Sequence, residues 1–421
     1  MSFPVLCADI GTTSLKAALI DIADAPSGGR LLAFARERYN AAGAAAAEAS
    51  AWEAAFYRAA RSLRETLPDA GAVAVCVSGN GPTLVPLPGG NGTSGASPFP
   101  PLHWFSPRVE PTPEGAASFF LPLAAFFRRS EPETYEKTSL FLSSHEWLSV
   151  RLGAEPVTVL PTPYYRPYYY DDRQCAAFSL DSRKFPPFVP IGTVTGRVSR
   201  EAAKRSGFAA GLPIVSGGPD FIMALLGSGA IEPGLVCDRA GSSEGINVCA
   251  AEPPSIATAD AFSLRVLPHA IEGLWNVSVM LPESGSILDR YRLETGQQNV
   301  PYEEMLRRMT SGVSAGETAG LHPVLRKIAD GERRALETLR KAGYPVREMR
   351  HSGGQAKSPL WNRLKALICD CALLVPEIAD TELAGDAAAV MLALGTAPNI
   401  VSACKKIVAF NPPPSKEFPW R

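Results

Sequence analysis

Apolar blocks separated by short polar stretches open the chain, and their order predicts an α/β fold. Residues 5–10 and 15–21 are mainly apolar and strand-like, so the polar residues 11–14 between them are expected to form a tight turn. Residues 48–67 place apolar side chains at helical spacing, and residues 72–77 form the next apolar run. The predicted order is therefore strand, strand, helix, strand.

The middle of the chain repeats this arrangement. Residues 212–219 form a short apolar run with glycines at its end, and Asp220 follows where the helix-like residues 221–226 begin. Residues 235–240 and 246–249 predict two more strands around a turn rich in glycine and serine. Two hairpins of the same kind, each with a turn of glycine and hydroxyl residues, imply that the protein has two halves that face each other.

A glycine-containing loop near the C-terminus is the third candidate feature. Residues 346–351 predict a strand, residues 353–358 a loop, and a helix is expected from there through Cys371. Glycines before a helix N-terminus can seat the phosphate or ribose of a nucleotide. A plain connection between strand and helix is the alternative.

Composition narrows the class of protein without indicating a function. The chain has 421 residues, of which 46% are hydrophobic, and a net charge of −1. That length suggests two domains or three, and the charge gives no reason to expect nucleic acid or an anionic membrane as a partner. The eight cysteines follow neither a disulfide nor a zinc pattern, which favours a cytoplasmic location. We expect no signal peptide and no membrane span.

The first turn carries residues suited to phosphate binding. Backbone N–H groups of such a turn can converge on an anion, and a carboxylate at the end of the preceding strand can hold a divalent cation through water. The residues concerned are Asp9, Gly11, Thr12, Thr13 and Ser14. An ordinary hairpin is the alternative. Asp220, between a strand and a helix, is placed to take a proton from a hydroxyl nucleophile.

Other motifs are weaker. Residues 90–95 match the dinucleotide pattern G-x-G-x-x-G but lack the strand before and the helix after that the pattern needs. Residues 241–245 match G-x-S-x-G, so a serine hydrolase at Ser243 is a remote alternative, although a β-type segment follows the serine instead of a helix. Five tyrosines within residues 164–170 predict either a sugar-stacking or oligomer surface, or an amphipathic hairpin whose rings cover a neighbouring element.

Taken together, the ordered motifs resemble the FGGY family of carbohydrate kinases, and within it most resemble the xylulokinases. Residues 9–16, through Lys16, resemble the first phosphate motif, and residues 217–220 resemble the Gly-Gly-Asp signature. Gly241, Ser242 and Ser243 resemble the second phosphate motif. The adenosine motif is represented by Gly353, Gly354, Gln355 and Ser358.

The resemblance implies two ribonuclease-H-like domains of the actin and hexokinase type, at residues 1–232 and 233–421, around an interdomain cleft. It implies ATP on the motif residues above, with Lys16 among them, Mg²⁺ near Asp9, and a sugar or polyol as the second substrate. Asp220 would be the general base. The oligomeric state, a homodimer included, and the identity of the sugar are left open.

The acceptor side departs from the family pattern. The sugar-reading segment is Asn80-Gly81-Pro82, the usual Trp-Asn-Asp-x-Arg becomes a segment from Trp104 to Arg108 without its acid, and Phe221 replaces an asparagine. A family segment between Gly296 and Gly320 has no counterpart. The resemblance implies Asn80, Gly81, Trp104, Arg108 and Asp220 as substrate contacts. An active kinase is favoured, and a nucleotide-binding regulatory protein without kinase activity is the alternative.

Overall fold

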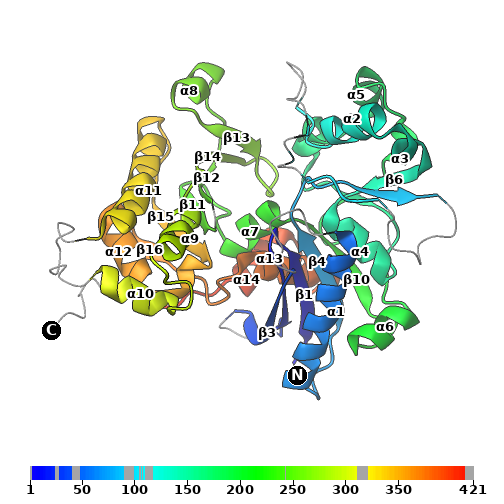
Figure 1. Ribbon diagram of the computed structural model, residues 1–421, viewed down its shortest axis with the longest axis horizontal. Coiled ribbons are helices and arrows are strands. Elements are labelled where there is room, and N and C mark those ends of the chain that lie inside the picture. Colours follow the sequence, from blue (N-terminus) through cyan, green and yellow to red (C-terminus); the bar gives the residue numbers. More distant parts are fainter. Residues whose placement is uncertain are drawn as a thin grey trace. The chain divides into compact units, whose positions relative to one another are not determined.

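The computed structural model describes residues 2–23, 28–39, 48–89, 99–103, 106, 108–109, 117–241, 243–310 and 321–412. The chain forms two compact units, each described here by itself (Figure 1). The first unit consists of Met1–Met223 and Glu382–Ile407, and the second of Ala224–Thr381 and Val408–Arg421. A C-terminal stretch thus returns to the first unit, whereas the sequence predicted one boundary near residue 232.

A six-stranded sheet organises the first unit, in the strand order β3-β2-β1-β4-β10-β9. Strands β1, β4 and β10 are parallel neighbours, whereas β2 and β9 run antiparallel to the strands beside them. The bounds are β1 (Pro4–Ile10), β2 (Ser14–Asp21), β3 (Arg30–Arg38), β4 (Ala74–Gly79), β9 (Val194–Arg197) and β10 (Pro213–Pro219).

Helices cover both faces of this sheet. Helix α1 (Ala49–Thr66) packs on β2 and β3 through a buried stripe that includes Trp52, Phe56 and Leu63. Helix α13 (Thr381–Ala393) lies behind β4, where Asp386 accepts a hydrogen bond from Ser78 Oγ. The alanine-rich sequence of α13 favours a helix and leaves it thin enough for close packing.

The remaining elements of the first unit form short helices and small two-stranded sheets. The helices are α2 (Leu121–Ser130), α3 (Pro132–Lys137), α4 (Ser144–Leu152), η2 (Pro163–Tyr168), α5 (Asp172–Ala177), η3 (Ser182–Lys184), α6 (Arg200–Ser206) and α14 (Ile400–Ile407). The strands are β5 (Val85–Pro88) with β6 (Thr138–Leu142), and β7 (Thr158–Val159) with β8 (Phe188–Val189). Helix α7 (Asp220–Ser228) begins directly after β10.

The second unit is built on a similar sheet, in the order β13-β14-β12-β11-β15-β16. Strands β11 and β12 form an antiparallel hairpin, and β15 lies parallel to β11. The bounds are β11 (Leu235–Ala240), β12 (Glu244–Ala250), β13 (Arg265–Pro268), β14 (Trp275–Leu281), β15 (Glu348–Gly353) and β16 (Leu373–Leu374).

Helices of the second unit enclose two apolar clusters. Helix α11 packs on β12 and β14 and also on α9 and α12. The bounds are α8 (Ile256–Ala261), α9 (Gly285–Glu294), α10 (Tyr302–Met309), α11 (Pro323–Lys341), η4 (Gln355–Lys357) and α12 (Pro359–Cys369). No helix in the part of the chain that the structure describes is long and apolar enough to cross a membrane.

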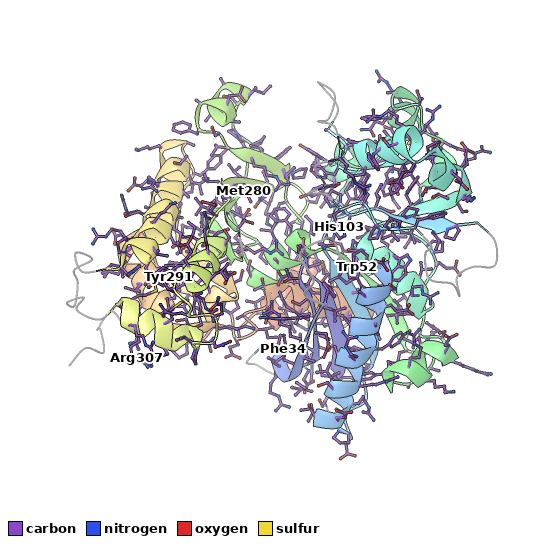
Figure 2. The ribbon with its side chains drawn as sticks, in the orientation of Figure 1. Phe34, Trp52, His103, Met280, Tyr291 and Arg307 are labelled. Atoms are coloured by element: carbon purple, nitrogen blue, oxygen red, sulfur yellow. The ribbon has the colours of Figure 1, made fainter. Side chains whose placement is uncertain are left out.

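Most predicted elements are present, with informative differences. The predicted order of strand, strand, helix and strand lacks β3, which is an edge strand. Exposed side chains on β3, such as Phe34, alternate with the buried Ala33 and Ala35 (Figure 2). Residues Pro163–Tyr168 form a 3₁₀ helix and not a hairpin, and Tyr169 and Tyr170, which follow it, are buried against Phe120 and Phe188. The segment that follows it therefore packs as core.

The contact between α13 and α7 leaves no room for a side chain at Gly385. A methyl group there would lie within 3.0 Å of the Met223 carbonyl oxygen, whereas a methyl group on Gly331 of α11 would meet only Leu281, at 3.8 Å. We expect G385A to destabilise the protein by about 1–3 kcal/mol, since a backbone atom cannot move aside. The control G331A should be neutral or stabilising by about 0.5–1 kcal/mol. Thermal unfolding of both variants measures this, and equal melting temperatures would contradict it.

Candidate functional site

The turn between β1 and β2 is a tight hairpin connection, as the sequence predicted. The Gly11 N–H donates to the Ser14 carbonyl at 3.0 Å and closes the turn. Thr12 and Thr13 are exposed at its tip, whereas Ser14 is buried and its Oγ accepts a hydrogen bond from Arg36 at 2.9 Å. Short side chains at the tip let a ligand approach the backbone.

Acidic groups gather below this turn. Asp9, at the end of β1, is 1% exposed and its Oδ2 lies 3.4 Å from Lys16 Nζ. Lys16 also lies 3.5 Å from Glu382 of α13. Asp386, one helical turn further, is fully buried. Burial and then the nearby charge of Asp9 raise the pKa of Asp386 well above its usual range. Burial thus favours the protonated form of Asp386, and Lys16 places a positive charge beside Asp9.

Strand register brings three predicted residues into one row. Ile10 pairs with Gly79, and Gly79 pairs with Pro219. The next residue of each strand, namely Gly11, Asn80 and Asp220, therefore emerges at the same sheet edge. Asn80 is tied there because its N–H donates to the Ile10 carbonyl at 2.8 Å.

Asp220 is the first residue of α7 and is partly exposed. Its Oδ1 accepts a hydrogen bond from the Phe221 N–H at 2.6 Å, which orients the carboxylate. Gly81 lies beside it in space: a methyl group on Gly81 would sit 3.3 Å from Pro219 Cβ. The segment that departs from the family pattern is thus adjacent to the predicted base.

Several polar atoms of the first unit are buried without a hydrogen-bond partner among the described residues. Both side-chain atoms of Asn80, the Thr83 hydroxyl and the indole N–H groups of Trp52 and Trp147 are in this state. Trp52 also meets His103 edge to face at 5.9 Å (Figure 2). An unsatisfied buried polar group costs about 1–3 kcal/mol, so hydroxyl groups of a ligand would be stabilising here.

The second unit repeats the row of loops. Ala240 of β11 pairs with Gly353 of β15, so the turn starting at Gly241 and the loop starting at Gly354 leave the sheet side by side. The Gly241 N–H donates to the Ser243 carbonyl at 2.9 Å, so this turn is one residue shorter than the first, in which Gly11 donates to Ser14. Gly353 has a φ of +88°, and a methyl group there would collide with the Ala240 carbonyl. Only glycine fits this crossing.

The 353–358 loop is held by its own side chains. Gln355 is buried, and its Nε2 donates to Ser284 Oγ at 3.1 Å. Its Oε1 is buried without a hydrogen-bond partner among the described residues. Ser358 is the N-cap of α12: its Oγ accepts from the Trp361 N–H at 3.1 Å and donates to Glu303 at 2.5 Å. The Ser358 hydroxyl is thus engaged in capping.

Two predicted site residues, Trp104 and Ser242, lie outside the described residues, as does the glycine-rich stretch 90–95. Arg108 is exposed and pairs with Glu131 at 3.3 Å.

Ser243 is followed directly by strand β12, whereas a nucleophile elbow needs a helix at that point. The structure therefore argues against a serine hydrolase.

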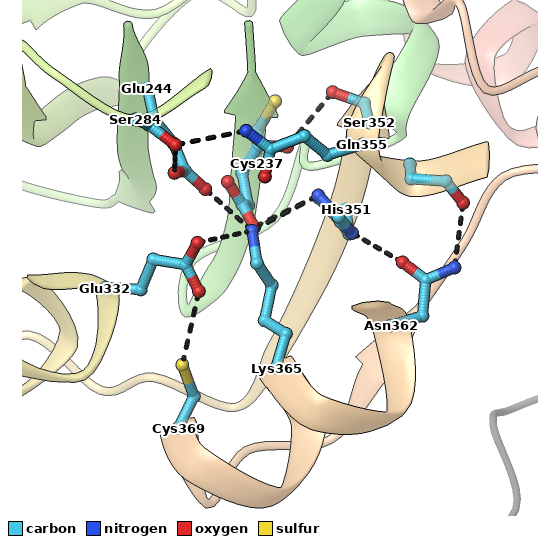
Figure 3. A network of polar contacts seen from close by, with 12 residues as sticks. Cys237, Glu244, Ser284, Glu332, His351, Ser352, Gln355, Asn362, Lys365 and Cys369 are labelled. Atoms are coloured by element: carbon cyan, nitrogen blue, oxygen red, sulfur yellow. Dashed lines mark hydrogen bonds and ion pairs between the residues drawn. The ribbon is translucent and has the colours of Figure 1, made fainter. Parts of the chain in front are cut away.

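Sequence reasoning missed a buried charge cluster behind the two loops of the second unit (Figure 3). We call it the Lys365 cluster. Lys365 of α12 is 0% exposed, and its Nζ contacts three carboxyl groups and a histidine. The partners are Asp238 Oδ2 at 2.6 Å, Glu244 Oε1 at 2.6 Å, Glu332 Oε1 at 3.0 Å and His351 Nε2 at 3.1 Å. A lysine that interrupts the apolar stripe of a helix was the available sequence signal.

The pKa directions define the charges of the Lys365 cluster. Burial and then the charge of Glu244 raise the pKa of Asp238, and burial and Glu244 likewise raise the pKa of Glu332. Burial alone would raise the pKa of Glu244, but the charge of Lys365 together with hydrogen bonds from Asp238, Lys365 and Ser284 lowers it. The cluster therefore holds one ionised carboxylate opposite one ammonium. Asp238, Glu244 and His351 are close enough to hold a metal ion, yet Lys365 contacts all three.

Comparison with known proteins identifies the class. The N-terminal domain of the FGGY family of carbohydrate kinases matches residues 118–227, and the C-terminal domain of that family matches residues 298–394. The chain carries both domains and belongs to the FGGY family of carbohydrate kinases.

Curated relatives are similar at low identity. An autoinducer-2 kinase of Klebsiella pneumoniae is 22% identical over 344 residues, which cover 69% of this chain and 64% of the relative. An L-fuculokinase of Salmonella typhi is 25% identical over 320 residues, covering 68% of this chain and 67% of the relative. The chain thus spans about two thirds of the length of these relatives.

Solved structures share the fold across nearly the whole chain. A xylulose kinase from Rhodospirillum rubrum has a TM-score of 0.75 at 19% identity, with coverage of 97% of this chain and 93% of that one. A glycerol kinase from Plasmodium falciparum, solved with ADP, has a TM-score of 0.74 at 12% identity, with coverage of 98% and 94%. The predicted two-domain α/β fold of the FGGY, actin and hexokinase type is confirmed.

The raised pKa of Asp386 predicts a pH dependence of stability. In the unfolded chain this carboxyl ionises near pH 4, whereas its pKa is raised in the folded protein, so its contribution to stability falls as the pH rises above about 4. D386N should remove this loss. The free energy of unfolding of D386N, relative to that of the wild type, should therefore increase between pH 5 and pH 8. Urea unfolding at both pH values measures the difference. D69N, at an exposed carboxyl, is the control, and a parallel response of the two variants would contradict the assignment.

Proposed function

We propose that this protein is an ATP-dependent carbohydrate kinase that phosphorylates a hydroxyl group of a sugar or polyol, with Asp220 as the general base. The observation that carries the proposal is the row formed by Gly11, Asn80 and Asp220 at the carboxyl ends of three adjacent parallel strands. A phosphate-type turn, an amide with unsatisfied hydrogen bonds and a carboxylate then lie at one sheet edge. These are the groups that phosphoryl transfer to an alcohol needs.

The proposed nucleotide contacts fit the chemistry of ATP. The turns that begin at Gly11 and Gly241 offer backbone N–H groups for phosphate oxygens, as expected for Thr12, Thr13, Ser242 and Ser243. Gly354 has open space where a side chain would be, and the unpartnered Gln355 oxygen could accept from an adenosine N–H or hydroxyl group. Gly353 and Ser358 shape this loop.

A magnesium ion is a finer part of the proposal. Magnesium prefers oxygen ligands and usually keeps several of its waters, so Asp9 would hold it through one carboxylate or through water. When bound, the ion would neutralise charge on the phosphates. Lys16, beside Asp9, supplies a further positive charge for the same purpose.

In the proposed mechanism the protein acts mainly by orientation. The Asn80 amide would donate hydrogen bonds to hydroxyl groups of the sugar and accept hydrogen bonds from them. The hydrogen bond from the Phe221 N–H keeps the Asp220 carboxylate in one orientation. An Asp220 oxygen would take the proton of the attacking hydroxyl as the new bond to phosphorus forms. Positioning of the two substrates would contribute most of the rate.

The proposed sugar-binding side has fewer polar residues than the family pattern. Trp104 and Arg108 remain proposed contacts to the substrate. The unsatisfied atoms of Asn80 and Thr83 nevertheless favour a working sugar site over a nucleotide-binding protein that ignores sugars. The relatives and structural neighbours named above act on different sugars and polyols, so the identity of the substrate needs a direct screen. The eight free cysteines are consistent with a cytoplasmic enzyme.

The test is ATP hydrolysis stimulated by a panel of pentuloses, hexuloses and polyols in the presence of Mg²⁺. We expect at least one to stimulate turnover, and D220N to lower that rate about 10²- to 10⁴-fold, because the amide cannot accept the proton. D69N, which changes an exposed carboxyl elsewhere, should leave the rate unchanged. Tight ATP binding without stimulation by any polyol would instead support the regulatory protein.

A further inference from the structure

The two nucleotide loops of the second unit meet at one corner. Ser284 is the residue before α9, and Gly285 is the first residue of that helix. The Gly285 N–H donates to the Gly241 carbonyl at 3.0 Å, and a methyl group on Gly285 would collide with the same oxygen. Ser284 Oγ accepts from Gln355 Nε2 at 3.1 Å. This corner therefore touches the Gly241 turn on one side and the 353–358 loop on the other.

One arm connects this corner to the Lys365 cluster. Ser284 Oγ donates to Glu244 Oε2 at 2.7 Å, and the other oxygen of Glu244 accepts from Lys365 at 2.6 Å (Figure 3). Glu244 is 1% exposed and Ser284 is 1% exposed, so water does not compete for these bonds. The chain of contacts runs from Lys365 through Glu244 and Ser284 to Gln355.

A second arm reaches the same loop through His351. The Asn362 Nδ2 group donates to the Ala356 carbonyl at 2.7 Å, so its Oδ1 must face His351 Nδ1, also at 2.7 Å, as the acceptor. His351 Nδ1 therefore carries the proton, and its Nε2 accepts from Lys365 at 3.1 Å. Two independent chains of hydrogen bonds thus lead from one ammonium to adjacent residues of the 353–358 loop.

We propose that the Lys365 cluster is a positioning device that holds the 353–358 loop against the Gly241 turn through Ser284 and Asn362. This inference rests on the proposed function in one respect, since it takes both loops as the nucleotide site. Lys365 is a positioning residue and does not contact the nucleotide. The ammonium holds Asp238, Glu244 and His351 in place as a bound cation otherwise would.

The test compares two buried serines that each make hydrogen bonds in or beside the cluster. S284A removes the link to Gln355 and leaves Glu244 paired with Lys365. S352A is the matched control, because the Ser352 hydroxyl donates to the Asp238 carbonyl at 3.1 Å and does not touch Gln355. We expect S284A to weaken Mg-ATP binding about three- to tenfold and to raise the KM for ATP equally, with kcat and the KM for sugar unchanged.

Hydrogen exchange of the ligand-free protein gives a second readout that does not depend on ATP. Peptides covering residues 353–358 should exchange faster in S284A and in N362A, and at the wild-type rate in S352A. Lys365→Met should loosen both arms at once, and the two single-arm variants decide the matter if it fails to fold. Equal exchange in S284A and S352A would overturn the positioning role. Failure of the wild-type protein to bind Mg-ATP would overturn the nucleotide site instead.

Discussion

Parallel pairing of neighbouring strands is the constraint on which the rest of the structure depends. Paired parallel strands end at the same edge of the sheet. The pairing therefore places the residues that follow these strands in one row, and their side chains need not contact one another. Gly11, Asn80 and Asp220 form such a row in the first unit, and Gly241 and Gly354 form one in the second. Residues distant in sequence become neighbours because backbone hydrogen bonds fix the register, and the side chains then supply the chemistry.

Each unit has buried charged residues next to its row of loop residues. The charges are arranged differently in the two units. In the first unit, Lys16 is partly exposed and lies beside Asp9, while burial and the charge of Asp9 raise the pKa of Asp386. In the second unit, Lys365 is fully buried and is matched by the carboxylate of Glu244. Buried ion pairs are costly to desolvate and add little net stability. In the second unit, the hydrogen bonds of Glu244 and His351 connect this ion pair through Ser284 and Asn362 to the 353–358 loop.

Prediction from the sequence succeeded where apolar runs were long and glycines marked their ends. The hairpins around residues 11–14 and 241–243 follow this rule, and the helical spacing of apolar residues at 48–67 correctly predicted helix α1. Strand β3 was missed because one face of an edge strand is exposed and charged, which weakens the apolar pattern. The tyrosine-rich segment was placed in the wrong element because side-chain composition does not distinguish a hairpin from a 3₁₀ turn.

The sequence by itself determined the order of the elements, the motif residues and the resemblance to the FGGY family, because these are local patterns of a few consecutive residues. Only the tertiary structure decided that Gly81 lies against Pro219, that the Asn80 side chain has no hydrogen-bond partner among the described residues and that Lys365 joins Asp238, Glu244 and Glu332. These contacts join residues far apart in the sequence, and Asp238 and Lys365, for example, are separated by 127 positions. Burial and hydrogen-bond satisfaction depend on everything that surrounds an atom, and no local pattern records those surroundings.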